Sequence, residues 1–133
     1  MSDTFIANKF ENEFANEFEN LLNKVRETKP LIQQITNYVT INDCANMTLA
    51  IGASPIMADA IDEAEDIIAI SNALVINMGI INERTIPAMI TYGKATNKKN
   101  IPVILDPVGA EASKLRNDTV KRLTTTAFMI FLM

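Results

Sequence analysis

Hydrophobic side chains have the spacing of one long helix up to about residue 28 and of short strands and helices after it. In the first part they recur every three or four positions, with Glu, Asn and Lys between them: Phe10, Phe14, Phe18, Leu21, Leu22 and Val25. This spacing predicts an amphipathic helix from about residue 4 to 28, whose apolar stripe packs on the core or on a partner. Lys29-Pro30 should end the helix, because the residue before a proline is disfavoured in the α region.

After residue 30, short apolar segments alternate with helical ones. The predicted strands are Leu31–Ile35, Pro55–Ala58, Ala73–Asn77 and Ile101–Leu105, and the predicted helices are Ile41–Ile51, Asp62–Ile70, Asn82–Asn97 and a segment around Asn117–Leu123. Asn82 is expected to cap the third of these helices and Pro87 to kink it. The alternation predicts β-α units in one α/β domain, with a mainly parallel sheet and helices on both faces.

The last segment, Ala127–Met133, is apolar throughout. A segment of this kind is buried only if it forms a further strand of the sheet. Two hypotheses follow: either it forms that strand, or the polypeptide has lost what followed it. Left uncovered, such a strand favours aggregation, because it is low in charge and rich in strand-forming residues.

Composition favours a small-molecule partner over nucleic acid or a membrane. The 133 residues carry 12 basic and 16 acidic side chains, a net charge of −4, and form no basic stripe that could neutralise phosphates. The N-terminal segment is too charged for a signal peptide, and no apolar run has the length of a membrane span. The single cysteine, Cys44, forms no internal disulfide and has no basic neighbour in its helix, so we expect it to pack in the interior of a cytoplasmic protein.

Asp106 is the first candidate for a functional side chain. It stands at the carboxyl end of an apolar segment, NIPVILDPVGA (Asn100–Ala110), which is typical of a central strand covered on both faces. Ligands of open α/β sheets bind at this end, where a carboxylate can face a cation or a phosphate-bound metal. Pro107 stops the ladder and Gly109 permits a tight turn. The alternative is that Asp106 caps the next helix and the Pro-x-Gly segment only turns the chain.

Three further strand ends carry polar residues or glycine. Asn37 follows the first strand and can both donate and accept hydrogen bonds, although Thr40 could equally make this an ordinary helix start. Met57 could line an apolar ligand slot or simply pack in the core. Asn77 and Gly79 follow another strand, where the alternative is a turn. Because parallel strands deliver their carboxyl ends to one edge, we expect these residues to converge with Asp106.

Common nucleotide and nucleophile motifs are missing. The four glycines form neither G-x-G-x-x-G nor G-x-x-x-x-G-K-[ST], which disfavours a Rossmann dehydrogenase and a P-loop enzyme. The sequence has no histidine, which excludes the usual Ser-His-Asp and Cys-His systems.

Three motifs resemble the hydroxyethylthiazole kinase family: ITNYVTINDCANMTLAIGASPIMADA (Ile35–Ala60), ALVINMG (Ala73–Gly79) and VILDPVGA (Val103–Ala110). The resemblance runs from about Leu21 to about Arg122 and covers the amino-terminal half of the family's chain. It implies a ribokinase-like α/β fold and a homotrimer with active sites between subunits. It also implies phosphorylation of 4-methyl-5-(2-hydroxyethyl)thiazole by ATP with Mg²⁺, a step of thiamine biosynthesis and salvage.

The same resemblance implies roles for individual residues. Asn37, Val39 and Met57 match the positions that hold the thiazole, and Asn77 with Gly79 matches the strand end beside it. Asp106 matches the carboxylate near the nucleotide phosphates and the metal, with Gly109 in the same turn. Soft apolar side chains suit a sulfur heterocycle, and a carboxylate near phosphates can organise Mg²⁺.

The sequence departs from the family pattern in two respects. Glu111 stands where family members commonly carry a second glycine. The family's Arg-Gly-Asn segment, its following acidic residue, its ATP-site threonine and its catalytic Gly-x-Gly-Cys turn have no counterpart, and Cys44 does not match that cysteine. We therefore expect residues 1–133 to be the amino-terminal part of one kinase domain, inactive or nearly so alone. The alternatives are a non-catalytic fragment that binds thiazole or joins other subunits, and a general sugar or vitamin kinase, which the ITN and GASPIM segments disfavour.

Overall fold

A computed structural model describes residues 3–126 and 130–132, and the side chains of residues 13–126. Its helices are α1 (Asp3–Thr28), α2 (Ile41–Ala50), α3 (Ala64–Ile70), α4 (Thr85–Lys99) and α5 (Lys114–Thr124), with a 3-10 turn, η1 (Ile61–Glu63). Its strands are β1 (Leu31–Ile35), β2 (Ser54–Ile56), β3 (Ala73–Asn77), β4 (Val103–Asp106) and β5 (Ile130–Leu132). The predicted elements are all present, and strand boundaries differ from prediction by at most two residues.

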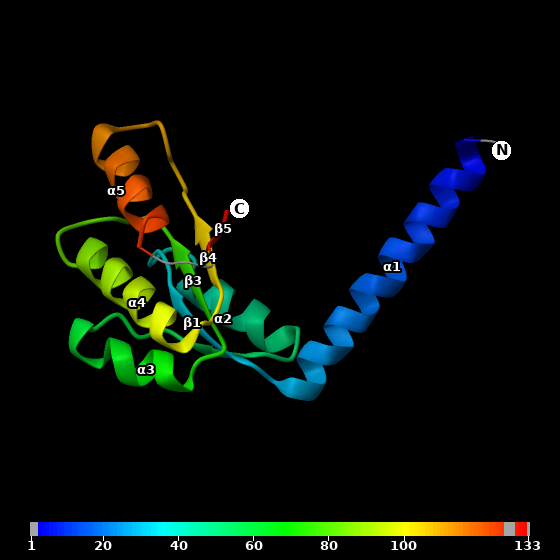
Figure 1. The fold of residues 1–133 in the computed structure, drawn as a ribbon, viewed down its shortest axis with the longest axis horizontal. Coiled ribbons are helices and arrows are strands. Elements are labelled where there is room, and N and C mark those ends of the chain that lie inside the picture. The colour runs from blue at the N-terminus through cyan, green and yellow to red at the C-terminus, as the bar shows by residue number, and fades with distance from the viewer. Residues whose placement is uncertain (1–2, 127–129, 133) are drawn as a thin grey trace.

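The five strands form one parallel sheet in the order β2-β1-β3-β4-β5 (Figure 1). Every pairing is parallel, and β5 pairs with β4 along Ile130–Leu132, which confirms the predicted extra strand for these residues. The rest of the apolar Ala127–Met133 segment lies outside the described residues. The register places Asn77 directly opposite Asp106. The sheet order therefore brings the carboxyl ends of β1, β3 and β4 side by side.

The core lies on one side of the sheet, under α3, α4 and α5 (Figure 1). Strand side chains that face these helices are buried among Met89 and Tyr92 of α4: Leu74, Ile76, Val103 and Leu105. Their neighbours Val75 and Ile104 are only half-buried. The expectation that β4 is covered on both faces is therefore wrong for this chain, since along β3 and β4 burial alternates with the strand period of two.

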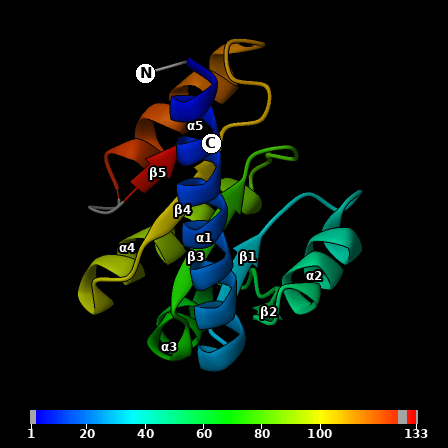
Figure 2. The ribbon, with the colours of Figure 1, turned by 90° about the vertical axis from the view of Figure 1, so that its right-hand side faces the viewer.

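Helix α1 projects away from the sheet (Figure 1), and in the view turned by 90° it stands in front of the sheet (Figure 2). Phe14 and Phe18 are 64% and 55% exposed, so the prediction that they pack in the core of this chain is wrong, and packing on a partner stays a prediction. The helix contacts the domain at its carboxyl end, where a Cβ on Gly52 would lie 2.7 Å from the Arg26 Cγ. No helix in the described part of the chain is long and apolar enough to cross a membrane.

Helix α4 begins at Thr85, three residues later than predicted. Asn82 lies ahead of the helix, and its Oδ1 accepts hydrogen bonds from the backbone N–H groups of Arg84 and Thr85, each at 2.9 Å. Pro87 therefore falls in the first turn. A proline is tolerated there because the first N–H groups of a helix have no partner within the helix, so the predicted kink is not required.

Candidate functional site

A row of hydrogen-bonded side chains crosses the carboxyl edge of the sheet. Asn37, two residues after β1, donates from Nδ2 to Asn77 Oδ1 at 3.2 Å. Asn77, the last residue of β3, donates from Nδ2 to Asp106 Oδ2 at 2.6 Å. The backbone N–H of Met78 also donates to the carbonyl of Asp106 at 3.0 Å. The structure therefore brings together three of the polar residues that the sequence singled out, in the order that the parallel register requires.

Asn37 holds the turn between β1 and α2. Its Oδ1 accepts hydrogen bonds from the Val39 N–H, the Thr40 N–H and the Thr40 hydroxyl, each at 3.1 Å. Thr40 occupies the cap position of α2, but its side chain makes no capping bond to the helix. The alternative of a helix start capped by the Thr40 side chain is therefore not what the structure shows, and the Asn37 amide orders this turn.

Gly79 lies against the same row because its missing side chain leaves room for two amides. Its N–H donates to Asn77 Oδ1 at 2.8 Å. A Cβ at this position would come 2.8 Å from Asn77 Oδ1 and 3.0 Å from Asn37 Nδ2. Contacts this short require the amides to move. Gly79 is therefore needed for close packing as well as for turning the chain.

Asp106 is the one residue predicted to bind a metal, and its carboxylate could supply one of the ligands of Mg²⁺. It is half-buried, and Asn77 donates to Oδ2, while Oδ1 accepts no hydrogen bond from the described residues. Among residues 3–126 and 130–132 no group of three acidic, histidine or cysteine side chains could hold a metal by itself. One carboxylate is compatible with Mg²⁺, which binds proteins through one or two carboxylates and takes its other ligands from substrate phosphates and water.

Val39 and Met57 differ in how far the chain encloses them. Met57 is half-buried just beyond the end of β2. Val39 is 85% exposed. The described part of the chain therefore covers Met57 in part and leaves Val39 open to solvent.

Glu111 adopts a backbone conformation that suits glycine. Its φ is +71°, in the left-handed region that side chains with a Cβ rarely adopt. Its N–H donates to the Asn117 side chain at 2.8 Å, which holds this turn against α5. A glycine at this position would adopt the same φ without strain, which is a physical reason for the glycine that the family commonly carries there.

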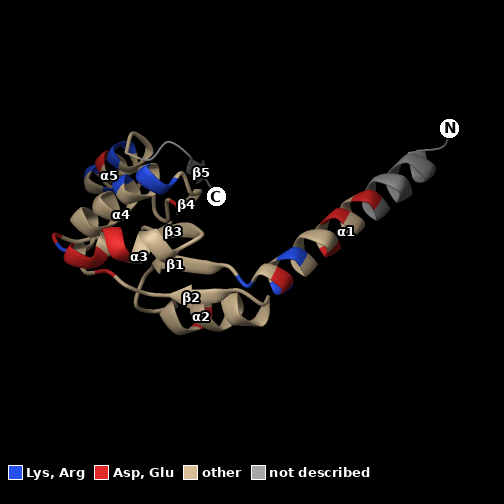
Figure 3. Cartoon of the chain, turned by 60° about the horizontal axis from the view of Figure 1, so that its bottom comes forward, with Lys and Arg blue, Asp and Glu red and all other residues tan. Residues whose placement is uncertain are grey.

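Sequence reasoning missed Arg116, which contacts both loops at this edge. The guanidinium of this α5 residue donates to three backbone carbonyl oxygens, those of Met78 at 2.6 Å, Val108 at 2.7 Å and Gly79 at 3.1 Å. Gly109, with φ +72°, lies against the same side chain, and a Cβ there would be 3.2 Å from Arg116 Nε. No sequence motif distinguished Arg116 from the other basic residues of α5, which Figure 3 shows gathered on that helix.

A second set of contacts holds the loops around Tyr38. Arg84 donates to the Tyr38 hydroxyl and pairs with Asp59 at 3.0 Å. These two neighbours raise the pKa of Arg84, the Tyr38 hydrogen bond more than the Asp59 charge. Arg84 precedes α4 and Asp59 follows β2, so the contacts join loops that start from three strands.

Cys44 is half-buried beside two threonines rather than fully buried in the core. Its sulfur lies 3.8 Å from the Thr36 hydroxyl and 3.9 Å from the Thr40 hydroxyl. The predicted interior packing is therefore only partly realised. Neither of these two neighbours is a basic side chain.

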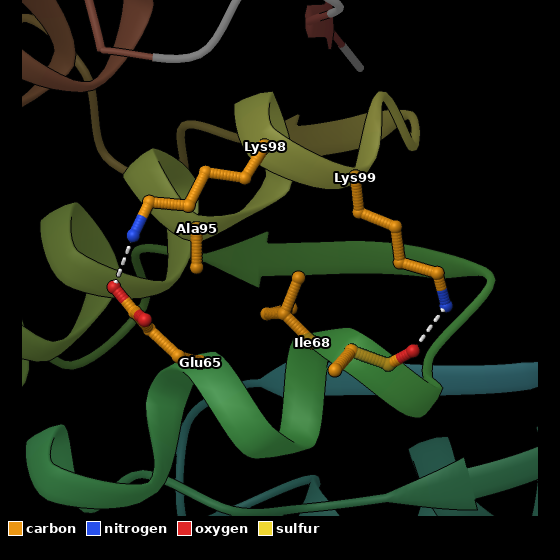
Figure 4. A pocket seen from close by; sticks show the side chains of 6 residues that line it. Glu65, Ile68, Ala95, Lys98 and Lys99 are labelled. Atoms are coloured by element: carbon orange, nitrogen blue, oxygen red, sulfur yellow. Dashed lines mark hydrogen bonds and ion pairs between the residues drawn. The ribbon is translucent and has the colours of Figure 1, made fainter.

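Two cavities lie outside the row. One, of about 330 Å³, lies between α3 and α4; an ion pair between Lys98 Nζ and Glu65 Oε1 at 2.5 Å crosses its rim, and Ile68 and Ala95 line it (Figure 4). It opens near the amino ends of β3 and β4, away from Asp106. The other, of about 350 Å³, is lined by Glu111, Asn117 and Lys121, among others. This second cavity adjoins the turn that follows Asp106.

Comparison with known proteins identifies hydroxyethylthiazole kinases among the relatives of this chain. The family model described as the hydroxyethylthiazole kinase family matches residues 22–131. A hydroxyethylthiazole kinase of Clostridium beijerinckii is 64% identical over 112 residues, covering 84% of this chain and 41% of its own. The hydroxyethylthiazole kinase of Ruminiclostridium cellulolyticum is 62% identical over 112 residues, which again cover 84% of this chain and 41% of the relative. The chain thus spans about two fifths of the length of these relatives.

A solved structure shows the same fold. The hydroxyethylthiazole kinase of Pyrococcus horikoshii OT3 is 38% identical and superimposes with a TM-score of 0.78, covering 84% of this chain and 44% of its own. The match confirms the ribokinase-like α/β fold that the resemblance implied.

Proposed function

Because the chain belongs to the hydroxyethylthiazole kinase family, we propose that the protein takes part in transferring phosphate from ATP to the hydroxyl group of 4-methyl-5-(2-hydroxyethyl)thiazole. The observation that supports it most directly is the row of Asn37, Asn77 and Asp106 at the carboxyl edge of the sheet. A small ligand at such an edge meets amide groups at one end of the row and a carboxylate at the other. This polarity suits a substrate with a neutral ring and a reacting hydroxyl group.

Each residue has a defined part in this proposal. The Asn37 amide orders the turn that carries Val39, and Met57 offers a soft apolar edge to the thiazole ring. Asp106, with a free Oδ1 among the described residues, would hold Mg²⁺, which when bound would neutralise charge on the transferring phosphate. Asn77 fixes the direction of that carboxylate by donating to Oδ2.

A complete reaction site needs groups that these 133 residues do not supply. None of the four glycines belongs to a Gly-x-Gly-Cys turn, and Val39 is open to solvent. We infer that the thiazole slot is closed by a second subunit, in line with the expected homotrimer, and that the ATP side lies on further polypeptide. Cytoplasmic location remains a prediction.

Purified chain incubated with the thiazole alcohol, ATP and Mg²⁺ tests the proposal. We expect binding of the thiazole by calorimetry and little thiazole phosphate. Robust turnover would contradict the view that the ATP side is missing. Absence of thiazole binding by the chain in an oligomeric form, checked by native mass spectrometry, would contradict the assignment of the thiazole side.

A non-catalytic role in subunit association is the second candidate function. It is favoured by the exposed apolar side chains of α1, Phe14, Phe18 and Leu21. Native mass spectrometry of the chain by itself, and of the chain mixed with a full-length relative, measures this association. A stable mixed oligomer supports association, whereas a lone monomer in both samples contradicts it.

A further inference from the structure

We propose that Arg116 is a positioning residue that ties together the loops after β3 and β4 and so sets the shape of the candidate site. Its Nη1 reaches one carbonyl from each loop, Met78 at 2.6 Å and Val108 at 2.7 Å. Its Nη2 adds a second carbonyl of the first loop, Gly79, at 3.1 Å. Both loops leave the carboxyl edge beside Asn77 and Asp106. One guanidinium therefore determines the distance between the two loops that flank the row.

The side chain is itself held in place by the start of α5. The Ser113 hydroxyl caps this helix by accepting from the Arg116 N–H at 3.3 Å. The arginine stem then lies against Gly109, where a Cβ would come 3.2 Å from Nε and 3.3 Å from Cδ. Gly109 thus leaves room for Arg116, which is a more specific reason for glycine than a turn alone.

The Arg116 guanidinium is suited to holding two loops together through their backbone carbonyls, a role called here the clamp. Among the described residues no carboxylate forms an ion pair with Arg116, so its hydrogen bonds go to backbone carbonyls. A guanidinium keeps its charge at any ordinary pH and presents its donors in a rigid planar fork. A lysine at this position would have one nitrogen for carbonyls in two loops, and should hold them less firmly.

The clamp connects to the ligand residues through Gly79. The Gly79 carbonyl accepts from Arg116, while the Gly79 N–H donates to Asn77 Oδ1. Asn77 in turn orients Asp106. Releasing the guanidinium should therefore loosen Gly79 first, and the Asn77 amide with it.

Amide hydrogen exchange on the purified chain, with thiazole binding measured in parallel, tests this proposal. The readouts are the Gly79 amide, which donates to Asn77 Oδ1, and the Ala110 amide, which donates to the Pro107 carbonyl at 2.9 Å. Arg116→Met should speed exchange of both amides by about tenfold, as expected for losing hydrogen bonds from a charged donor, while amides in the middle of β3 keep their wild-type rates. In Arg116→Lys the exchange rates of these two amides should lie between those of the wild type and of Arg116→Met. Arg122→Met, on the exposed part of the same helix, is the matched control for the charge and should leave both loops unchanged.

The binding measurement rests on the proposed function, but the exchange measurement does not. We expect Arg116→Met to weaken thiazole binding several-fold and Arg122→Met to leave it unchanged. If the wild-type chain binds no thiazole, the proposed function fails. The amide exchange rates still test whether Arg116 holds the two loops together. Wild-type exchange at Gly79 and Ala110 in Arg116→Met overturns the clamp, and so does faster exchange spread evenly over the sheet. Should Arg116→Met not fold, the same comparison is made with Arg116→Lys.

Discussion

Replacing Asn77 by alanine tests whether the row at the sheet edge is a set of energetically coupled groups. The substitution removes a charge-assisted hydrogen bond to Asp106 at 2.6 Å, one from the Gly79 N–H at 2.8 Å and a longer one from Asn37 at 3.2 Å. Hydrogen bonds to charged groups contribute roughly 1.5–3 kcal/mol and neutral ones about 1 kcal/mol. Because the site is only half-buried, we take about 1.5 kcal/mol for the bond to Asp106, about 1 kcal/mol for the bond from Gly79 and about 0.5 kcal/mol for the longer bond from Asn37. The expected loss in the free energy of unfolding is about 3 kcal/mol.

Urea denaturation followed by circular dichroism measures this loss. With a slope of about 2 kcal/mol per molar, the midpoint should fall by about 1.5 M. Asn46→Ala is the matched control, since Asn46 is exposed on α2 and the same side chain is removed there. Surface substitutions of this kind change stability by about 0.5 kcal/mol or less.

A double-mutant cycle then isolates the bond between Asn77 and Asp106. Asn77→Ala, Asp106→Ala and the double variant should show a coupling energy of about 1.5 kcal/mol. A coupling below about 0.5 kcal/mol would refute the reasoning, because the amide would then not hold the carboxylate in solution.

Three further predictions concern glycine positions and one buried tyrosine. Gly79→Ala should lower the free energy of unfolding in urea by about 1–3 kcal/mol, because the added Cβ would meet two amides. Gly93→Ala is the control: its Cβ would meet only a methyl group at 3.4 Å, so the variant should be neutral or stabilise α4 by up to about 1 kcal/mol. Glu111→Gly should stabilise by about 1 kcal/mol by relieving the positive φ; equal stability would mean that the turn adapts. Burial, and to a lesser extent the charges of Glu63 and Asp59, raises the pKa of Tyr92 to about 12. As the pH rises above 10, the unfolded chain therefore loses this proton before the folded chain does. The free energy of unfolding should fall by at most about 2 kcal/mol between pH 10 and 12. Tyr92→Phe should remove that part of the pH dependence of the urea midpoint.

The sequence predicted the elements that have a strong local pattern. Strands β1 and β3 have the predicted limits. β1 starts after Pro30 and ends before Thr36, and β3 is an apolar segment between Asn72 and its last residue, Asn77. The convergence of Asn37, Asn77 and Asp106 was also predictable, since parallel strands must deliver their carboxyl ends to one edge.

Other features depend on contacts that no local pattern encodes. Arg116 resembles its basic neighbours on α5 in sequence, and only the fold places its fork between two loops. The exposure of Phe14 and Phe18 likewise depends on what lies beside α1, because the helical spacing predicts packing on the core or on a partner and does not distinguish the two. Thr40 has the residue type of a cap, but Asn37 has a longer side chain and stands three residues earlier. The Asn37 Oδ1 accepts the hydrogen bonds of this turn instead.

The two glycines of the site are required for different reasons, and this difference shows how the site is built. Gly79 has no Cβ because two amides, Asn37 and Asn77, occupy that space. Gly109 combines a positive φ with the stem of Arg116 against its Cα. In both cases the space is filled by this chain's own polar side chains. An added methyl group would displace the amide that orients Asp106 at Gly79 and the Arg116 side chain at Gly109. The edge is therefore assembled before any ligand arrives, which lowers the entropic cost of binding one.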